Sequence, residues 1–177
     1  MKIGIIVAMD KELELLQGIQ LPQHEIFLVK SGIGKVNAAI ATINLLNEHH
    51  PDLVINSGVA GGIDTCLNVA DLVIGSQTCY HDFYAGDVSD HLKELGFEKF
   101  IQADVYAFQV AKQVAGSLTD VKFCLVCTGD QFITTPAELF QIKEKYPEAL
   151  FVDMESNAIA HVCAKKQVPF ISLRIIS

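Results

Sequence analysis

The stretch FVDMESNAIA, residues 151–160, decides the fold, because an apolar run of strand length passes there directly into an apolar segment of helical character. Two carboxylates, Asp153 and Glu155, lie where the strand-like run passes into the helical segment. Acidic side chains at the entrance to a core are costly unless a partner compensates them. The same order of apolar run and helical segment recurs along the chain, and such alternation is typical of an α/β domain. We therefore predict one three-layer α/β/α domain over residues 1–177, with a central mixed, mostly parallel sheet.

The predicted elements follow from the periods of the apolar residues. Thr135-Pro136-Ala137-Glu138 predicts a helix start, with threonine as N-cap, proline at the first helical position and glutamate closing a capping box. Residues 81–100 are polar and aromatic without a clear period and predict a long loop, of the kind that often reaches a site or a partner. The predicted strands cover residues 2–8, 25–31, 52–58, 71–78, 121–127, 149–152 and 169–176, and the predicted helices cover 10–17, 35–48, 104–116, 136–146 and 155–166.

The composition restricts the partners of the chain. Its 177 residues suit a single domain, and half of them are hydrophobic, which excludes a disordered chain and predicts that surface is buried against a second copy. The net charge of −8 and the absence of a basic stripe argue against a nucleic-acid-binding surface. No apolar run in the sequence approaches the roughly 20 residues that a membrane span requires.

The cysteines predict an intracellular protein without a metal site. Five cysteines are an odd number, and their apolar surroundings favour reduced thiols in a cytoplasmic protein. Residues 124–127 spell C-x-x-C within a predicted strand. Positions three apart in a strand point to opposite faces, so Cys124 and Cys127 are not expected to share a zinc ion.

Candidate functional residues follow the predicted strands, at the carboxyl ends where ligands bind in α/β sheets. Glu12 is either a surface acid favoured by the helix dipole or, if it points into the cleft, a group that orients or deprotonates a water. Residues 31–35, SGIGK, favour a tight strand-to-helix turn over an anion cradle. The glycine-rich residues 58–62 are equally consistent with close packing and with a backbone that approaches a ligand.

Three more charged residues belong to this set. Asp153 and Glu155 are either ordinary acids at a helix N-terminus, or one of them faces inward. An inward carboxylate would have acceptor oxygens for two adjacent sugar hydroxyls. Arg174 lies within a predicted buried strand, so it needs a carboxylate or water partner and indicates a polar cavity nearby.

Seven segments of the chain form a recognisable series, which in order is MKIGIIVAMDKE, KSGIGKVNAA, INSGVAGG, YHD, TGDQFI, VDMESNAIAHVC and VPFISLRIIS. Taken together, these segments resemble the nucleoside phosphorylase/hydrolase superfamily, and within it the 5′-methylthioadenosine/S-adenosylhomocysteine nucleosidases. The resemblance implies hydrolysis of the N-glycosidic bond of both nucleosides with release of adenine, as in methionine salvage. It also implies a homodimer in which the neighbouring subunit closes the 5′ pocket, and neither a metal nor a cofactor.

The resemblance also implies roles for individual residues. Glu12 would position and activate the attacking water. Met154 and Glu155 would line the ribose, with Glu155 accepting its hydroxyls. Phe132 would stack on the adenine, and the Ile133 backbone would read its edge. In full, the implied catalytic set is Glu12, Arg174 and Ser177, and the implied substrate-binding set is Val59, Ala60, Gly61, Phe132, Ile133, Asp153, Met154 and Glu155.

Two departures from the family pattern qualify these implications. Val59 stands where the family normally has serine, so one hydroxyl near the water is lost. The acid that protonates the purine in the family directly follows the serine that matches Ser177, and a closing helix comes after it. We therefore expect the natural chain to continue past Ser177, so that residues 1–177 are a C-terminally incomplete domain without the usual last helix.

Two alternative functions stay open from the sequence, and a third is disfavoured. One is a nucleoside hydrolase with a different 5′ group, of the futalosine type. Another, if the chain truly ends at 177, is a non-catalytic purine-nucleoside-binding paralogue. The third, a phosphorylase, is disfavoured because the loop after the first strand offers Asp10, Lys11 and Glu12, and an acid at the attack position would repel phosphate.

Overall fold

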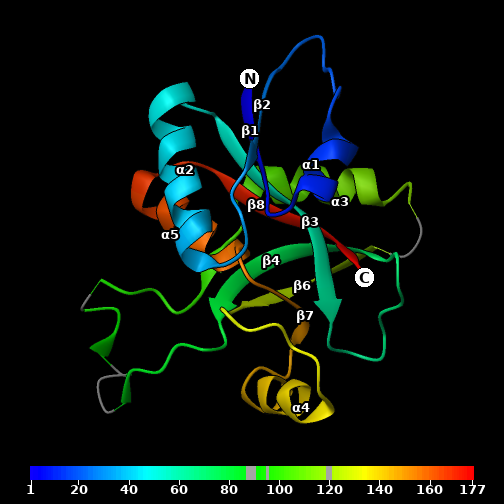
Figure 1. Ribbon diagram of the computed structural model, residues 1–177, viewed down its shortest axis with the longest axis vertical. Helices are drawn as coiled ribbons and strands as arrows, with labels where there is room; N and C mark the ends of the chain where they lie inside the picture. Colours follow the sequence, from blue (N-terminus) through cyan, green and yellow to red (C-terminus); the bar gives the residue numbers. More distant parts are fainter. Residues whose placement is uncertain (87–90, 95, 119–120) are drawn as a thin grey trace.

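The computed structural model describes residues 1–86, 91–94, 96–118 and 121–177. This part of the chain forms eight strands and five helices, which alternate except that the third, fourth and fifth strands follow one another without a helix between them (Figure 1). The strands are β1 (Lys2–Val7), β2 (Glu25–Lys30), β3 (Leu53–Gly62), β4 (Leu72–Tyr80), β5 (Ile101–Gln102), β6 (Val121–Thr128), β7 (Ala149–Asp153) and β8 (Phe170–Ile176). The helices are α1 (Asp10–Leu16), α2 (Lys35–His49), α3 (Val105–Ala115), α4 (Pro136–Lys145) and α5 (Ser156–Lys166).

The predicted elements agree with the observed ones, with two differences. Helix α4 begins at the predicted capping box, in which the Thr135 side chain and Glu138 bond each other's backbone N–H groups. Strand β3 continues through the glycines to Gly62, whereas we predicted its end near residue 58. The two-residue strand β5 was not predicted, and it directly follows the predicted loop 81–100, of which residues 87–90 and 95 lie outside the described residues.

The sheet is mixed and mostly parallel, which confirms the predicted α/β class. Its strand order is β2-β1-β3-β7-β6-β4-β5, and β8 pairs with both β3 and β4. Strands β3, β8, β4, β6 and β7 therefore close into a ring, which the predicted three-layer arrangement did not include. The ring closes through antiparallel pairs between β8 and β4 and between β7 and the glycine end of β3, contacts that alternation along the sequence does not predict.

The glycine end of β3 makes the second of these pairs possible. Gly61 and Gly62 lie opposite Val152 and Phe151 of β7. A Cβ atom on Gly61 would lie 3.3 Å from Val152 Cγ2, a tight contact that the absence of a side chain avoids. The glycine-rich stretch thus serves strand packing at this end.

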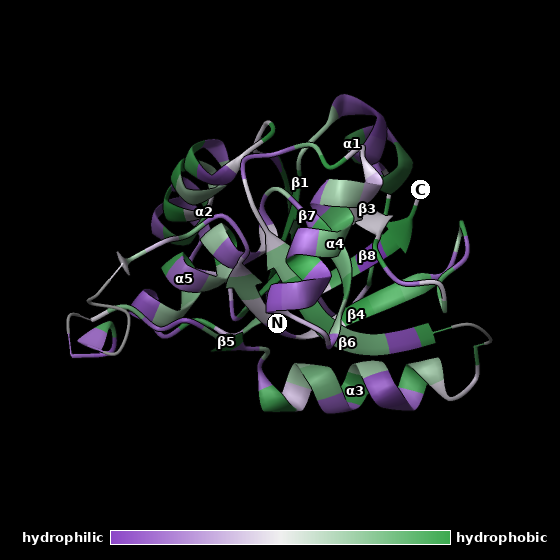
Figure 2. Cartoon of the chain, turned by 90° about the horizontal axis from the view of Figure 1, so that it is seen from below, coloured by the Kyte–Doolittle hydropathy of each residue, from purple (hydrophilic) through white to green (hydrophobic). Residues whose placement is uncertain are grey.

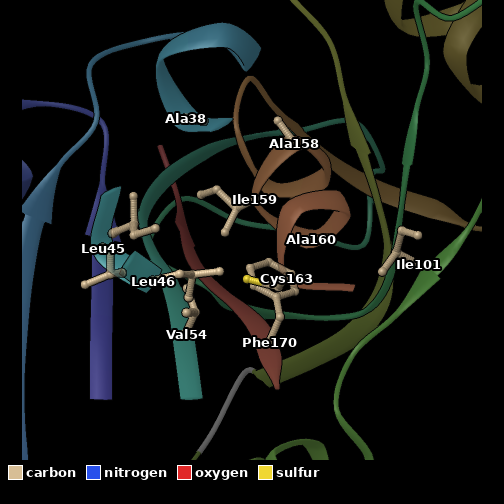
Figure 3. Packing of buried hydrophobic residues seen from close by; sticks show 11 residues of the cluster. Ala38, Leu45, Leu46, Val54, Ile101, Ala158, Ile159, Ala160, Cys163 and Phe170 are labelled. Atoms are coloured by element: carbon tan, nitrogen blue, oxygen red, sulfur yellow. The ribbon is translucent and has the colours of Figure 1, made fainter. Parts of the chain in front are cut away.

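Helices cover both faces of β3 and β8. Val54 of β3 packs in a cluster with α2 and α5, while its neighbours Leu53 and Ile55 pack against α3. This alternation is the two-residue period of a strand whose two faces are buried. Figure 3 shows Leu45 and Leu46 of α2, Ile159 of α5 and Val54 of β3 within one cluster, and Figure 2 shows α3 on another side of the sheet.

Four of the five cysteines are buried, in three different clusters, and Cys66 is exposed. Cys124 packs in one cluster and Cys127 in another, on opposite faces of β6, as predicted. Cys127 faces Cys79 of β4 with 3.6 Å between the Sγ atoms. Within the described ranges, no three His, Cys, Asp or Glu side chains are grouped as a metal site. In the same part of the chain, no helix has both the length and the apolar character needed to cross a membrane.

Candidate active site

A cavity of about 230 Å³ lies where α1 and α5 begin, beside β3, β8 and the loop after β6. It brings together residues that are far apart in the sequence, from Glu12 to Ser177. The structure places every residue of the two predicted sets on its wall, while their roles stay predictions. The lining consists of Ala8, Met9, Glu12, Ile33, Val59, Ala60, Gly61, Gln131, Phe132, Ile133, Val152, Asp153, Met154, Glu155, Arg174 and Ser177.

Glu12 points into the cavity and is buried, so the surface alternative for this residue is wrong. Its Oε2 atom accepts hydrogen bonds from the backbone N–H groups of Ala8 and Met9, both at 2.9 Å. Its Oε1 atom accepts from the N–H of Val59 at 2.8 Å. A carboxylate has about four lone-pair sites, so these three bonds fix its orientation and leave one site for a ligand or a water.

Gly58 makes room for this carboxylate. Its φ angle is +131°, a conformation that residues with a side chain rarely adopt. A Cβ atom there would overlap the carboxylate of Glu12 and would lie 2.9 Å from Arg174 Nη1. At this position of the glycine-rich stretch, therefore, the backbone approaches the charged groups of the cavity.

Arg174 of β8 is the cation of the cavity wall, with 1% of its surface exposed. Its Nη2 atom lies 3.0 Å from Asp153 Oδ2 and 3.1 Å from Glu155 Oε2. Its Nη1 atom donates to the carbonyls of Ser57 and Val59, both at 3.3 Å. We predicted a carboxylate or water partner for this arginine beside a polar cavity, and the structure places two carboxylates there.

Asp153 supports the start of α5 and also faces the cavity. It accepts hydrogen bonds from the Thr128 hydroxyl at 2.6 Å, from the Ser156 N–H at 3.2 Å and from the Ser156 hydroxyl. We predicted the first of these roles, but we expected only one of the two carboxylates to face inward. Both do, because β7 ends at Asp153 and the chain then turns, so that Asp153 and Glu155 converge on Arg174.

Glu155 is buried between a helix N-terminus and the arginine. Its Oε1 atom accepts from the N–H of Gly34 at 3.0 Å, and its Oε2 atom accepts from Arg174. Burial raises the pKa of Glu155 above its ordinary value, and the adjacent Arg174 charge offsets only part of this rise. With Glu12 and Asp153, the described wall carries three carboxylates and one guanidinium, so it favours a ligand on which positive charge develops.

The turn before α2 supplies N–H groups to carboxylates of the chain itself. Gly32 and Gly34 have φ angles of +84° and +95°, which confirms the predicted tight turn. Gly34 donates to Glu155, and the Lys35 N–H donates to Asp130 Oδ1 at 2.8 Å. These two donors, which an anion cradle would need, are therefore already occupied.

Phe132 offers an open aromatic face at the mouth of the cavity, with 80% of its surface exposed. Its neighbour Ile133 packs against the core cluster below and so anchors the loop. An aromatic ring this exposed beside a polar cavity is suited to stacking on a planar ligand. Ser177 closes another side, where its N–H donates to the Ala60 carbonyl at 3.1 Å and the end of β8 lies beside β3 (Figure 1).

The cavity and its carboxylates can be compared with those of known proteins. The family model described as "Phosphorylase superfamily" matches residues 2–177. The chain belongs to this superfamily. Among its relatives, the 5′-methylthioadenosine/S-adenosylhomocysteine nucleosidase of Haemophilus influenzae (strain PittEE) is 39% identical over 203 residues, which cover 100% of this chain and 86% of the relative. The nucleosidase of the same name from Geobacillus sp. (strain WCH70) is 36% identical and is covered to 85%.

Solved structures of the superfamily share the fold. The S-adenosylhomocysteine nucleosidase of Streptococcus pyogenes, in complex with 5-methylthiotubericidin, has a TM-score of 0.87 at 30% identity, covering 100% of this chain and 83% of that one. The 5′-methylthioadenosine/S-adenosylhomocysteine nucleosidase of Neisseria meningitidis, in complex with methylthio-immucillin-A, has the same TM-score and identity, covering 99% and 85%. This chain thus lies within the nucleosidase branch of the superfamily.

The structure adds residues to the site that the sequence did not single out. Gln131 lies on the cavity wall beside Phe132, and it could have been found as its neighbour in a loop we had already marked. Gly34 acts through its N–H on Glu155, a contact between residues 121 positions apart. No pattern along the chain signals a contact of this kind.

Proposed function

We propose that this chain hydrolyses the N-glycosidic bond of 5′-methylthioadenosine and S-adenosylhomocysteine and releases adenine, a reaction that serves methionine salvage. The observation that carries the proposal is the convergence of Glu12, Glu155 and Phe132 on one cavity. The nucleosidase names of relatives that match the whole chain support the choice of substrates.

The carboxylates act on the sugar in this proposal. Cleavage of a glycosidic bond passes through an oxocarbenium-like state, in which positive charge develops on the ribose ring. Glu155 has one oxygen bonded to Gly34 and the other to Arg174, and its remaining lone pairs accept the ribose hydroxyls. Its negative charge stabilises the transition state more than the neutral substrate, which is the condition for catalysis.

The purine and the water occupy opposite ends of the cavity. Phe132 stacks on the adenine, and the backbone at Ile133 hydrogen-bonds its edge, with Met154 beneath the ribose. Glu12 holds the attacking water with the lone pair that its three backbone donors leave free, and Arg174 and Ser177 support this end. Val59 makes the wall there more apolar than a serine would, while its backbone N–H still anchors Glu12.

Water is the nucleophile of the proposal rather than phosphate. A phosphate dianion needs free backbone donors or basic side chains, and the donors of Gly34 and Lys35 are bonded to Glu155 and Asp130. The excess of carboxylates on the wall would also repel a dianion. Both observations favour hydrolysis over phosphorolysis.

The test is to incubate the chain with 5′-methylthioadenosine, with and without phosphate, and to follow adenine and the sugar product. We expect adenine release independent of phosphate, with free methylthioribose as the sugar. Futalosine in the same assay examines the alternative 5′ group. Glu155→Gln should lower the rate far more than the thermal midpoint, and an undiminished rate would contradict the role of Glu155.

We also propose a homodimer with its interface on α2. Val36, Ile40 and Ile43 follow helical spacing and are exposed, and Ile33 continues this α2 stripe to the cavity wall. An apolar stripe that reaches a site is suited to a second copy that completes its open side. The described part of the loop 81–100 is proposed to take part in closing the 5′ pocket.

Three broader proposals go with this function. Residues 1–177 form a single domain, which the continuous ring of strands supports. The three-layer description applies around β3 and β8, where helices pack on both faces. A cytoplasmic location fits the cysteines, all five of which are free thiols.

A further inference from the structure

Beside the cavity, three charged residues tie two loops together. Lys35, at the start of α2, places its Nζ atom 2.7 Å from Asp82 Oδ2 and 3.7 Å from Asp130 Oδ2. The backbone closes the cluster, because Asp82 Oδ2 accepts from the Asp130 N–H at 2.9 Å and Asp130 Oδ1 accepts from the Lys35 N–H at 2.8 Å. We call Lys35, Asp82 and Asp130 the loop clamp; none of them lies on the cavity wall.

Each side of the loop clamp continues directly into a group of the site. On one side, Lys35 follows Gly34, whose N–H holds Glu155 Oε1 at 3.0 Å. On the other side, Asp130 is followed by Gln131 and Phe132, which form the proposed purine end of the cavity. The loop clamp therefore links Glu155, which is proposed to bind the ribose, to Gln131 and Phe132, which are proposed to bind the base.

The conformation of Gly34 is matched to this arrangement. Its φ angle is +95°, and a Cβ atom there would lie 3.0 Å from Asp130 Oδ1, so the carboxylate lies close against the turn. In its ionised form, the Asp82 carboxylate can accept hydrogen bonds from both Lys35 and the Asp130 N–H. Burial alone would raise the pKa of Asp82, but the hydrogen bonds from Lys35 and from the Asp130 N–H outweigh it and hold the pKa below its ordinary value.

We propose that Lys35, Asp82 and Asp130 are positioning residues that hold Glu155 in register with the purine-binding segment. The inference rests on the proposed function and deepens it. The loop clamp makes the ribose contact and the base contact depend on each other, so a complete nucleoside gains affinity that adenine alone does not. Partly exposed ion pairs add little to stability, so the main effect of the loop clamp is on the geometry of the bound ligand.

The experiment compares two lysines in matched ion pairs. Lys35 and Lys143 have side-chain exposures of 27% and 26%, and each lies 2.7 Å from an aspartate, Asp82 and Asp64. Lys143 also donates to two backbone carbonyls, so its loss should cost at least as much stability. Lys35→Met and Lys143→Met are compared with the unchanged chain by calorimetric binding of 5-methylthiotubericidin and of adenine, by kcat and KM, and by thermal midpoint.

We expect Lys35→Met to weaken binding of 5-methylthiotubericidin about tenfold, the range of coupling between groups in contact, and to change adenine binding about twofold at most. Lys143→Met should change neither affinity, although its thermal midpoint falls as far or further. Lys35→Arg, which keeps the charge, should restore most of the nucleoside affinity. In a Glu155→Ala background, which removes the acceptor of the Gly34 N–H, the effect of Lys35→Met should disappear, since it acts through Glu155.

Other results would overturn the inference. Equal losses for adenine and for the nucleoside, equal effects of the two lysine variants, or a loss that persists with Glu155→Ala would each mean that the cluster only stabilises the fold. If Lys35→Met does not fold, Asp82→Asn makes the same comparison against Asp64→Asn. An unchanged chain that binds the nucleoside but releases no adenine would contradict the proposed function alone, and one that binds no nucleoside would contradict both.

Discussion

Gly58 shows how a single residue without a side chain can define a charged site. Replacement by alanine would introduce a strained φ angle, for about 1–3 kcal/mol, and a methyl group that overlaps Glu12. We expect Gly58→Ala to lower kcat/KM about 100-fold or more, because small displacements of catalytic groups have effects of that size. Steady-state kinetics with a thermal melt measure both effects.

The matched control for this prediction is Gly116→Ala. Gly116 ends α3 in a right-handed helical conformation and lies outside the cavity wall, so alanine should leave kcat/KM unchanged there. A Gly58→Ala variant as active as this control would contradict the geometry described for Glu12.

The raised pKa of Glu155 leads to a prediction for kcat/KM on the acid side of the pH profile. Because burial raises its pKa, the carboxylate takes up a proton at a higher pH than an ordinary glutamate, and kcat/KM should fall as the pH drops through that value. For stability the sign is opposite: a raised folded-state pKa makes this group favour the fold as the pH falls. The rate should therefore decline while the contribution of Glu155 to the thermal midpoint increases, and rate and melting measured across one pH series test this.

At the scale of elements, the packing of α2 against α5 supports the site. Leu45 of α2 is 2% exposed, packs in the cluster with Ile159 and lies against Gly4 of β1. Leu45→Ala should destabilise the fold by about 2–5 kcal/mol through the cavity it leaves. The kcat of the folded fraction should change little, because Leu45 does not line the cavity. Chemical denaturation provides the measurement.

The exposed Leu15 of α1 is the control for this change. Its side chain is 84% exposed, so Leu15→Ala should alter stability by about 0.5 kcal/mol or less. A loss as large as that of Leu45→Ala would mean that α1 is covered in the assembled protein.

Most of the helices and strands could be predicted, because the patterns that mark them lie within short stretches of the sequence. The capping box of α4 involves four consecutive residues, and the apolar runs of β3 and β8 mark strands covered on both faces. The ring closure could not be predicted, since the β4–β8 and β3–β7 pairs join segments that no local period connects. The inward turn of both Asp153 and Glu155 was missed for a related reason: it depends on Arg174, which lies on another strand.

At the scale of the whole molecule, the α2 stripe predicts the assembly. Val36→Glu should dissociate the proposed homodimer, and kcat/KM should fall because the open side of the cavity loses its cover. Sedimentation velocity over a range of concentrations, with kinetics at the same concentrations, measures both. Val105→Glu on α3 is the matched control, since Val36 and Val105 are 69% and 70% exposed. A monomeric unchanged chain, or equal effects of the two variants, would contradict the interface.

The closed ring also determines where one copy of the chain can grow onto another by backbone pairing. Strands of the ring have hydrogen-bonded neighbours on both sides, so β2 is the one long strand with an unpaired edge among the described elements. Unpaired edges are the templates for fibrils and misassembled aggregates. Charged residues, Glu25 and Lys30, occupy the two ends of this strand. Efforts to keep the protein dispersed at high concentration should therefore begin with β2.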